Sequence, residues 1–369
     1  MGYGEWFLIA LVCFGLLLAG YYVFVMTASR GRTIVLDPAG SGQEGVSVVV
    51  VSRNGLESLR SLIPSLLAQK YPRFEIVVVN DRSFDNTDVF LKSIQRNYPT
   101  VLRVATIPAD TSYPWAGRKF AIAMGVKAAQ YDRIVLLNNT AVPASENWLD
   151  TFVSTFNGPT EYVIGYTVLR GGTAFSKAGY FTRMADSLAW AGAGKPYRAY
   201  PSNFSFRKST FLSRNGYMKD MRVPSGEADF LLQDDANGGN TAILTVREAM
   251  TMEKTVLSHK ERREKQVEDY ATYRRYSLSA KFKTLLPYFL KAFFLLSAVV
   301  YLVIFPSRWA GWAIVGVVTV LSWVNGLVCA RRFHYTRWMA AGLCMDIVLL
   351  PLNLLRTIVA AASLPRMWK

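Results

Sequence analysis

Polar residues directly follow two of the most hydrophobic runs in the middle of the chain. Asp81 comes after the run Phe74–Val79, and Asn138 and Thr140 come after a run that ends at Leu137. A carboxylate at the end of a strand can accept hydrogen bonds from a nucleotide base or a ribose hydroxyl. The sequence around Asp81 is Asn-Asp-Arg-Ser, which is equally typical of a turn. These residues alone leave both interpretations open.

Two basic residues lie near the same runs. Arg53 follows the valine-rich run Val46–Val51, and Lys119 starts a helical pattern that continues to Gln130. Fixed cations suit a diphosphate group, which spreads its charge over several oxygens. The alternative, that both residues are ordinary surface charges, stays open at this point.

The elements that must position these side chains alternate between strand and helix. Apolar runs bounded by polar residues predict strands, and leucines at helical spacing from Leu56 to Leu67 predict a helix between the first two. The predicted strands are Val46–Val51, Phe74–Val79, Leu102–Ile107, Arg133–Leu137 and Tyr162–Tyr166. Alternation of this kind predicts an α/β fold with a mostly parallel central sheet flanked by helices, and a ligand at the carboxyl ends of the strands.

Histidine and cysteine chemistry is not expected in this protein. His259 and His334 have no second histidine or cysteine at ligand spacing, so neither zinc binding nor histidine-based catalysis is predicted. Cys13, Cys329 and Cys344 all lie inside apolar runs. The absence of cysteine from the polar middle of the chain fits a reducing compartment.

The composition indicates that part of the chain lies in lipid. Hydrophobic residues make up 51% of the 369 residues, charged residues only 18%, and the mean hydropathy is +0.18. The net charge of +16 arises from 42 Lys and Arg against 26 Asp and Glu. Because the basic residues flank the apolar runs, they predict contact with anionic lipid headgroups and no nucleic acid partner.

Three apolar regions predict membrane segments at both ends of the chain. Residues 6–26 are long enough for a transmembrane anchor, and residues 288–330 form two runs with the short break of a transmembrane hairpin. Residues 339–363 contain Asp346 and Arg356, and charges are costly at mid-bilayer. For this last segment we favour a re-entrant or interfacial helix over a full crossing.

The charges around the first anchor predict its orientation. Arg30 and Arg32 follow the anchor, whereas only Glu5 precedes the run, so a signal peptide is disfavoured. The positive-inside rule then places the N-terminus outside and the main domain in the cytoplasm. We therefore expect an integral protein of the inner or plasma membrane.

Several stretches, in their order along the chain, resemble family 2 glycosyltransferases, whose fold is the glycosyltransferase A type. They are Val48–Asn54, Ser65–Pro72, Val79–Thr87, Gly117–Lys119 leading into Phe120–Ala129, and Pro143, Ser145 and Trp148. The resemblance runs from about Val46 to Tyr276 and predicts a domain over residues 46–283. It implies a nucleotide diphosphate sugar as substrate, with contacts from Arg53, Asp81, Lys119, Asn138 and Thr140.

The sequence departs from the family at its metal site. The family carries an Asp-x-Asp motif whose carboxylates help to hold Mg²⁺ or Mn²⁺ against the diphosphate. Here Asn138, Asn139 and Thr140 stand at that place, and they offer neutral oxygens only. The motif therefore predicts no metal ligand of its own, and leaves open whether Mg²⁺ or Mn²⁺ still approaches these oxygens.

Two further family signatures are altered. The segment that carries the catalytic base reads Gly226 to Phe230, which places Ala228 where the central acid belongs and leaves Glu227 and Asp229 on either side. The family's Gln-x-x-Arg-Trp signature falls on Thr272 to Tyr276 and keeps only Arg275. The resemblance thus implies Glu227 or Asp229 as base and Arg275 at the leaving group.

Two functions follow from the resemblance. The first is an inverting transferase that moves a sugar from a nucleotide diphosphate sugar to a lipid-linked or membrane-proximal acceptor. The second is a catalytically inactive pseudo-glycosyltransferase that serves as a binding or scaffold partner of an active glycosyltransferase in polysaccharide biosynthesis. In either case the family-like segment Pro201–Lys208 predicts Asn203 and Arg207 on the acceptor side. Calorimetry against nucleotide diphosphates separates the two.

Overall fold

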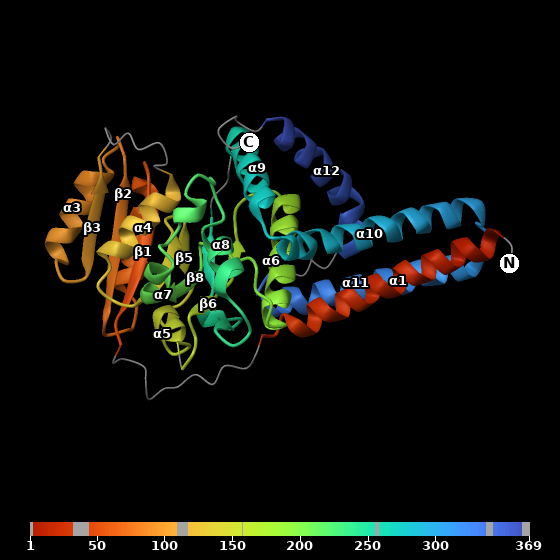
Figure 1. Cartoon of the computed structure of the whole chain (residues 1–369), viewed down its shortest axis with the longest axis horizontal. Coiled ribbons are helices and arrows are strands. Elements are labelled where there is room, and N and C mark those ends of the chain that lie inside the picture. The colour runs from red at the N-terminus through yellow and green to blue at the C-terminus, as the bar shows by residue number, and fades with distance from the viewer. Residues whose placement is uncertain are drawn as a thin grey trace.

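The structure is a computed structural model. It describes residues 3–31, 44–108, 117–156, 158–254, 258–336 and 342–363, the last range in backbone only for 342–349 and 356. Figure 1 shows an α/β domain at one end of the molecule and a bundle of long helices at the other.

A seven-stranded sheet forms the centre of the α/β domain within the described residues. Its order is β3-β2-β1-β4-β8-β6-β9, and only β8 runs antiparallel to its neighbours. The strands are β1 Val46–Ser52, β2 Phe74–Asp81, β3 Leu102–Ile107, β4 Arg133–Asn138, β6 Tyr162–Ile164, β8 Phe204–Arg207 and β9 Thr241–Ile243. The mostly parallel sheet and all five predicted strands are confirmed.

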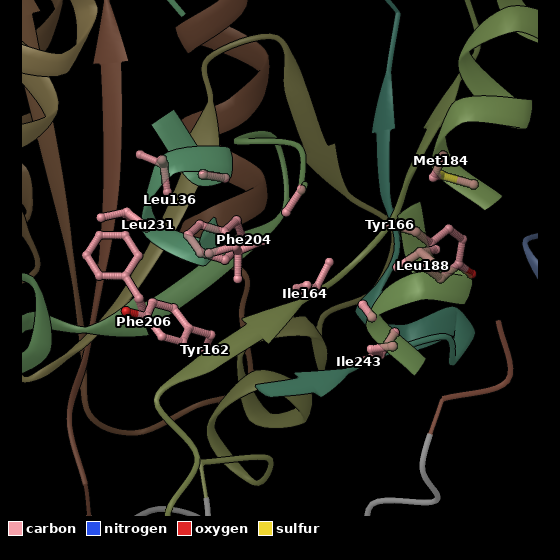
Figure 2. Close-up of a cluster of buried hydrophobic side chains, with 14 of the residues drawn as sticks. Leu136, Tyr162, Ile164, Tyr166, Met184, Leu188, Phe204, Phe206, Leu231 and Ile243 are labelled. Atoms are coloured by element: carbon pink, nitrogen blue, oxygen red, sulfur yellow. The ribbon is translucent and has the colours of Figure 1, made fainter. Parts of the chain in front are cut away.

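Helices cover both faces of this sheet because the side chains of a strand alternate between faces. Val46, Val48 and Val50 of β1 pack with helix α2, Leu56–Leu67, in one hydrophobic cluster. Val49 and Val51 face the other way, toward α4, Arg118–Ala128. A Cβ at Gly125 of α4 would lie 2.6 Å from Val49, so this glycine lets α4 approach the sheet closely. Figure 2 shows the second cluster where it continues to Leu136 and Phe204.

The remaining elements build the far side of the domain. A small sheet has the order β5-β10-β7, from Ala141–Pro143, Thr251–Glu253 and Thr167–Leu169. The remaining helices of the domain are α3 Thr87–Asn97, α5 Trp148–Val153, α6 Ala174–Gly192, α7 Lys208–Ser213, α8 Glu227–Asp235 and α9 His259–Arg275, with 3₁₀ turns at Met218–Asp220 and Arg247–Ala249.

Among the described residues, three helices are long and apolar enough to cross a membrane: α1 Tyr3–Ala28, α10 Leu278–Ile304 and α11 Trp309–Arg332. They contain the predicted anchor and both runs of the predicted hairpin. Leu11 and Leu18 of α1 are buried against Phe294 of α10 and Val318 of α11, which joins the three into one bundle. Many of the bundle's outward side chains are large and apolar, as a lipid-facing surface requires.

The last helix, α12 at Gly342–Ala362, is not among these three. It lies against α9, where Ala360 packs on Val267 and Ala271, and it also contacts α10 and α11. Figure 1 shows it beside α9, tilted away from the bundle axis. Whether this segment crosses the membrane or lies at its surface stays a prediction.

Candidate functional site

The loops after β1 and β2 are held together as one surface. Asn54 adopts a left-handed conformation with φ 49°, its backbone N–H donates to Ser83 Oγ at 2.9 Å, and its Oδ1 accepts from the N–H of Phe84 at 2.9 Å. Because β1 and β2 are parallel neighbours, their carboxyl ends lie at the same edge of the sheet. Arg53 is exposed at this edge, where the sequence placed it.

Asp81 is the last residue of β2, not a loop residue. Its carboxylate accepts two hydrogen bonds from Arg82, one from Nε at 2.7 Å and one from Nη2 at 3.1 Å. Arg82 takes a left-handed φ of 51°, which is unusual for a side chain of this size. A carboxylate has about four lone-pair positions and Arg82 uses two of them, so Asp81 keeps capacity for further donors. Its contact with a nucleotide stays a prediction.

Arg118 connects the altered metal motif with the altered base segment. It is the first residue of α4; its Nη2 donates to Oδ1 of Asn138, and its Nε lies 3.2 Å from Oε1 of Glu227. Asn138 ends β4 and Glu227 begins α8, so three elements meet at this guanidinium. The side chain of Glu227 is 5% exposed and that of Arg118 33%, so the cation has a face open to solvent. We name these three residues the arginine bridge.

The second position of the metal motif is also occupied by an internal contact. Thr140 Oγ1 donates to Oε1 of Glu253 at 2.7 Å, which brings one carboxylate to the motif from β10. Within the described part of the chain, no group of three or more His, Cys, Asp or Glu could hold a metal ion. One carboxylate beside a guanidinium does not fit a divalent cation that prefers several anionic oxygens.

Lys119 does not lie where the resemblance placed it. Its ammonium is buried and donates to the backbone carbonyls of Asp220, Val223 and Ser225 at 3.1, 2.9 and 2.7 Å, and it lies 4.5 Å from the centre of the Phe230 ring. Burial lowers the pKa of Lys119 to about 8, although nearby acids oppose this. The three carbonyls use all three of its donors, so the predicted diphosphate contact is replaced by a role in holding the segment before α8.

Asp229 is unsuited to act as the base. Its Oδ1 accepts from the N–H of Ala199 at 3.1 Å, and its Oδ2 accepts from the hydroxyl of Tyr276. Burial raises the pKa of Asp229, while Arg198 and the Tyr276 hydrogen bond favour its ionised form. Of the two predicted bases, Glu227 is the one with a partner at the strand edge. Tyr276, which replaces the family's last aromatic residue, thus fixes Asp229 in place.

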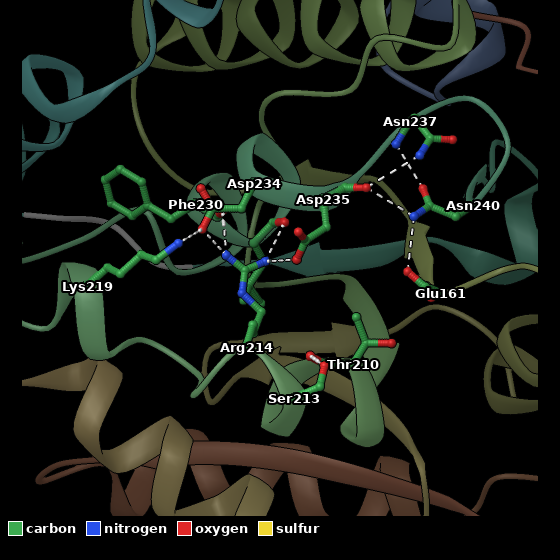
Figure 3. A network of polar contacts seen from close by, with 11 residues as sticks. Glu161, Thr210, Ser213, Arg214, Lys219, Phe230, Asp234, Asp235, Asn237 and Asn240 are labelled. Carbon is green, nitrogen blue, oxygen red and sulfur yellow. Dashed lines mark hydrogen bonds and ion pairs between the residues drawn. The ribbon is translucent and has the colours of Figure 1, made fainter.

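The start of α8 is positioned by contacts from α9. Gly226 precedes the helix with φ 87°, and a Cβ there would lie 2.5 Å from Thr272 Cγ2. Thr272 Oγ1 and Ser225 Oγ share a hydrogen bond of 2.8 Å. At the other end of α8, Arg214 pairs with Asp234 and Asp235, as Figure 3 shows. Contacts with Thr272 at its start and with Arg214 at its end therefore fix α8, which carries Glu227.

The end of α9 brings further charges toward the arginine bridge. Arg275 is exposed at the last residue of α9 and lies within electrostatic reach of Asp220. Its contact with a leaving group stays a prediction. On the same helix, Lys265 and Glu268 interact electrostatically with Glu227 and Arg118. Neither residue could be assigned to the site from the sequence, because a charged helix face carries no signal of its own.

The two predicted acceptor-side residues serve the fold. Asn203 is fully buried; its Oδ1 accepts from Trp148 Nε1 at 3.1 Å, and its Nδ2 donates to the carbonyls of Tyr166 and Ala249 at 2.8 and 2.7 Å. Arg207 of β8 lies opposite Arg133 of β4 in the antiparallel strand register, at the edge of the sheet away from Arg118. β8 runs antiparallel and carries its last residue away from Arg118 and Asn138. The acceptor-side role of Asn203 and Arg207 stays a prediction that this placement does not support.

Arg118 and Glu253 are two further residues of the site that could not be assigned from the sequence. Arg118 directly precedes Lys119 in the family-like segment. The segment Gly117–Lys119 was therefore identified, but Lys119 and not Arg118 was expected at the diphosphate. Glu253 lies on a three-residue strand whose pairing with Ala141 could not be read from the chain.

Comparison with known proteins agrees with the fold. The family described as Glycosyl transferase family 2 matches residues 47–215. A poly-beta-1,6-N-acetyl-D-glucosamine synthase of Staphylococcus epidermidis is 25% identical over 122 residues, which cover 33% of this chain and 28% of that protein. A glucosyl-dolichyl phosphate glucuronosyltransferase of Haloferax volcanii is 27% identical over 181 residues, 47% of this chain and 55% of that protein. The chain thus spans about a quarter to a half of these relatives.

A solved structure shares the fold over nearly its whole length. It is the mannosyltransferase PcManGT from Pyrobaculum calidifontis in complex with GDP-Man and Mn²⁺, with a TM-score of 0.60 and 14% identity. The alignment covers 97% of this chain and 98% of that one. At this identity the match establishes the shared fold, including the helical bundle, and nothing about ligands.

Proposed function

Because the chain is a family 2 glycosyltransferase-like protein, we propose that it transfers a sugar from a nucleoside diphosphate sugar to a lipid-linked or membrane-proximal acceptor. The observation that carries the proposal is the arginine bridge. It puts a fixed, partly open cation at the carboxyl edge of the sheet, where α/β folds bind ligands and where the family's metal would neutralise the diphosphate.

In the proposed reaction the acceptor oxygen attacks the anomeric carbon as the bond to the diphosphate breaks. The electron pair of that bond goes to the leaving nucleoside diphosphate, so negative charge grows on its oxygens. The guanidinium of Arg118 would stabilise this charge by charge-assisted hydrogen bonds. Glu227 holds Arg118 in position, and takes the proton wherever the acceptor is a hydroxyl.

The proposal includes a membrane protein with its main domain in the cytoplasm. Three candidate spanning helices and the basic residues that flank them support it. Ser279 is exposed at the start of α10 and suits labelling as a single cysteine, once Cys13, Cys329 and Cys344 are replaced by serine. Labelling of Ser279→Cys by an impermeant reagent in intact cells would refute the orientation.

The test is release of nucleoside diphosphate by the purified full chain in detergent. A panel of uridine and guanosine diphosphate sugars is supplied with and without membrane lipid extract. Arg118→Gln and Glu227→Gln should each slow release, the first by roughly a hundredfold. Glu57→Gln is the matched control, because Glu57 is an exposed acid on α2 that pairs with Arg60 at 3.2 Å. Equal rates in all four proteins would refute the assignment of the site.

The second candidate is the inactive scaffold protein. It is favoured by one observation: Ala228, at the place of the family's acid, is fully buried in the hydrophobic core and offers no group to the site. Calorimetry separates the two candidates. Binding of a nucleotide diphosphate sugar with no release under any acceptor condition would favour the scaffold, whereas acceptor-dependent release favours the enzyme.

A further inference from the structure

Glu253 brings a carboxylate to the carboxyl edge of the central sheet from the neighbouring small sheet. Its Oε1 accepts from Thr140 Oγ1 at 2.7 Å, and Thr140 lies two residues after Asn138, which Arg118 contacts. Two residues of a chain span at most about 7 Å. The carboxylate of Glu253 and the guanidinium of Arg118 are therefore attached to two nearby points of the turn that follows β4.

The backbone of Glu253 is fixed on both sides. β10 is the central strand of the small sheet, and Glu253 lies opposite Ala141 of β5 and Leu169 of β7 in the strand register. Its carbonyl also accepts from the N–H of Arg170 at 2.7 Å. A side chain on such a strand keeps its place whether or not a ligand is bound, which suits a residue that discriminates between ligands.

The charge of Glu253 has no cation beside it, unlike that of Glu227. Glu227 Oε1 lies 3.2 Å from Nε of Arg118, and only 5% of the Glu227 side chain is exposed. Within the described ranges, the carboxylate of half-buried Glu253 makes no ion pair, and the hydrogen bond from Thr140 is its only one. An ionised carboxylate can accept several hydrogen bonds, so Oε2 remains for the donors of a ligand.

The strand order gives the edge a direction. β2, β1 and β4 are successive neighbours in the central sheet, and β8 and β6 follow. Asp81 ends β2 and Arg53 follows β1, so both lie on one side of Asn138 at the end of β4. Glu253 comes from the other side, because β10 pairs with β7, which follows β6 in the chain. In Figure 1, β5, the other partner of β10, lies on the side of β1 that faces α6 and the bundle.

A nucleoside diphosphate sugar has its groups in the same order along its length: nucleoside, diphosphate, sugar. With the nucleoside at Asp81 and the diphosphate at Arg118, the sugar reaches Glu253. Hydroxyls of an uncharged sugar donate charge-assisted hydrogen bonds to an ionised carboxylate, whereas a carboxylate on the sugar meets a like charge at close range. Resting on the proposed function, we propose that Glu253 selects donors with an uncharged sugar and rejects donors that carry a uronic acid.

The test is calorimetry of matched donors with the purified full chain in detergent. The pairs are UDP-glucose with UDP-glucuronate and GDP-mannose with GDP-mannuronate, in which a carboxylate replaces the terminal hydroxymethyl group. For the nucleotide that binds, the neutral donor should bind about tenfold or more tightly than the uronate. Glu253→Gln should bring the two affinities within about threefold, mainly by tightening the uronate, because it removes the charge and keeps an acceptor oxygen.

Three further variants complete the comparison. Glu248→Gln is the matched control, because Glu248 is an exposed acid of the turn before β10 and its loss changes the net charge equally. This control should keep the preference for the neutral donor. Thr140→Val should weaken the preference and Thr140→Ser should keep it, because only serine retains a hydroxyl that donates to Glu253. Unchanged affinity for the bare nucleoside diphosphate shows that each variant is folded.

Two results would overturn the proposal. One is equal affinity of the unmodified protein for the neutral and the uronate donor, or a Glu253→Gln variant that discriminates like Glu248→Gln. The other is slower release of nucleoside diphosphate from every donor in Glu253→Gln with no change in relative affinity, because Glu253 would then serve the acceptor. Failure of the proposed function looks different: the unmodified protein would bind no nucleoside diphosphate at all, with or without a sugar, and the selection would fall with it.

Discussion

The two halves of the central sheet use their polar side chains differently. In the half made of β3, β2, β1 and β4 all strands are parallel, so the residues that follow them gather at one edge: Arg53, Asp81 and Asn138. In the half built around β8, the predicted residues Asn203 and Arg207 are used inside the fold or lie at the opposite edge. The position of a residue at the end of a strand predicts which edge of the sheet it occupies only where the direction of that strand is known.

The same contrast holds between the two basic residues that begin α4. Arg118 points to the strand edge and remains partly open, whereas Lys119, the next residue, is buried under three carbonyls. Successive residues on a helix point about 100° apart, so only one of them can face the site.

The largest expected effect is on stability, at Asn203. Asn203→Ala removes three buried hydrogen bonds, to Trp148, Tyr166 and Ala249, and should lower the free energy of unfolding by about 3 kcal/mol. Thermal unfolding in detergent measures it. If Asn203 were an acceptor ligand after all, the variant would keep its melting temperature and lose transfer activity alone.

The next effect concerns the conformation before α8. Gly226→Ala should cost at least about 1 kcal/mol because φ is 87°, and more because the new Cβ meets Thr272. Glu227 is the next residue, so the substitution should also displace its carboxylate. The rate of nucleoside diphosphate release should therefore fall by more than the loss of folded protein alone would cause. Gly158→Ala, also at a positive φ but with nothing near its Cβ, is the control. Equal loss of activity in both variants would argue that Gly226 has no link with the site.

The smallest effect is expected at Arg207. Its Nε donates to the carbonyl of Thr160 at 2.9 Å, and it lies 3.4 Å from Asp132, at the edge remote from Arg118. Arg207→Gln should therefore leave nucleotide affinity and transfer rate within about twofold, and lower stability by no more than about 1 kcal/mol. Selective loss of acceptor-dependent turnover in this variant would restore Arg207 to the acceptor side.

Much of the fold could be predicted from the sequence because it depends on local patterns. The valine runs of β1 and β2, the leucines of α2 and the long apolar helices all carry strong periodicity or length signals. The site depended on pairings between distant segments. Arg118 and Glu227, like Thr140 and Glu253, are more than a hundred positions apart, and Asp229 and Tyr276 are 47 apart. Periodicity gives no information on such pairings.

The proposed function requires that the guanidinium of Arg118 serves at the diphosphate, where the family's motif would hold a metal. The direct measurement is the affinity of the full chain for uridine and guanosine diphosphate, in chelator and in excess Mn²⁺, at low and high salt, before and after Arg118→Gln. We expect affinity to change by less than about threefold with Mn²⁺, to fall with salt, and to fall about tenfold or more in the variant. A large Mn²⁺ requirement in the unmodified protein, with little effect of Arg118→Gln, would contradict the account.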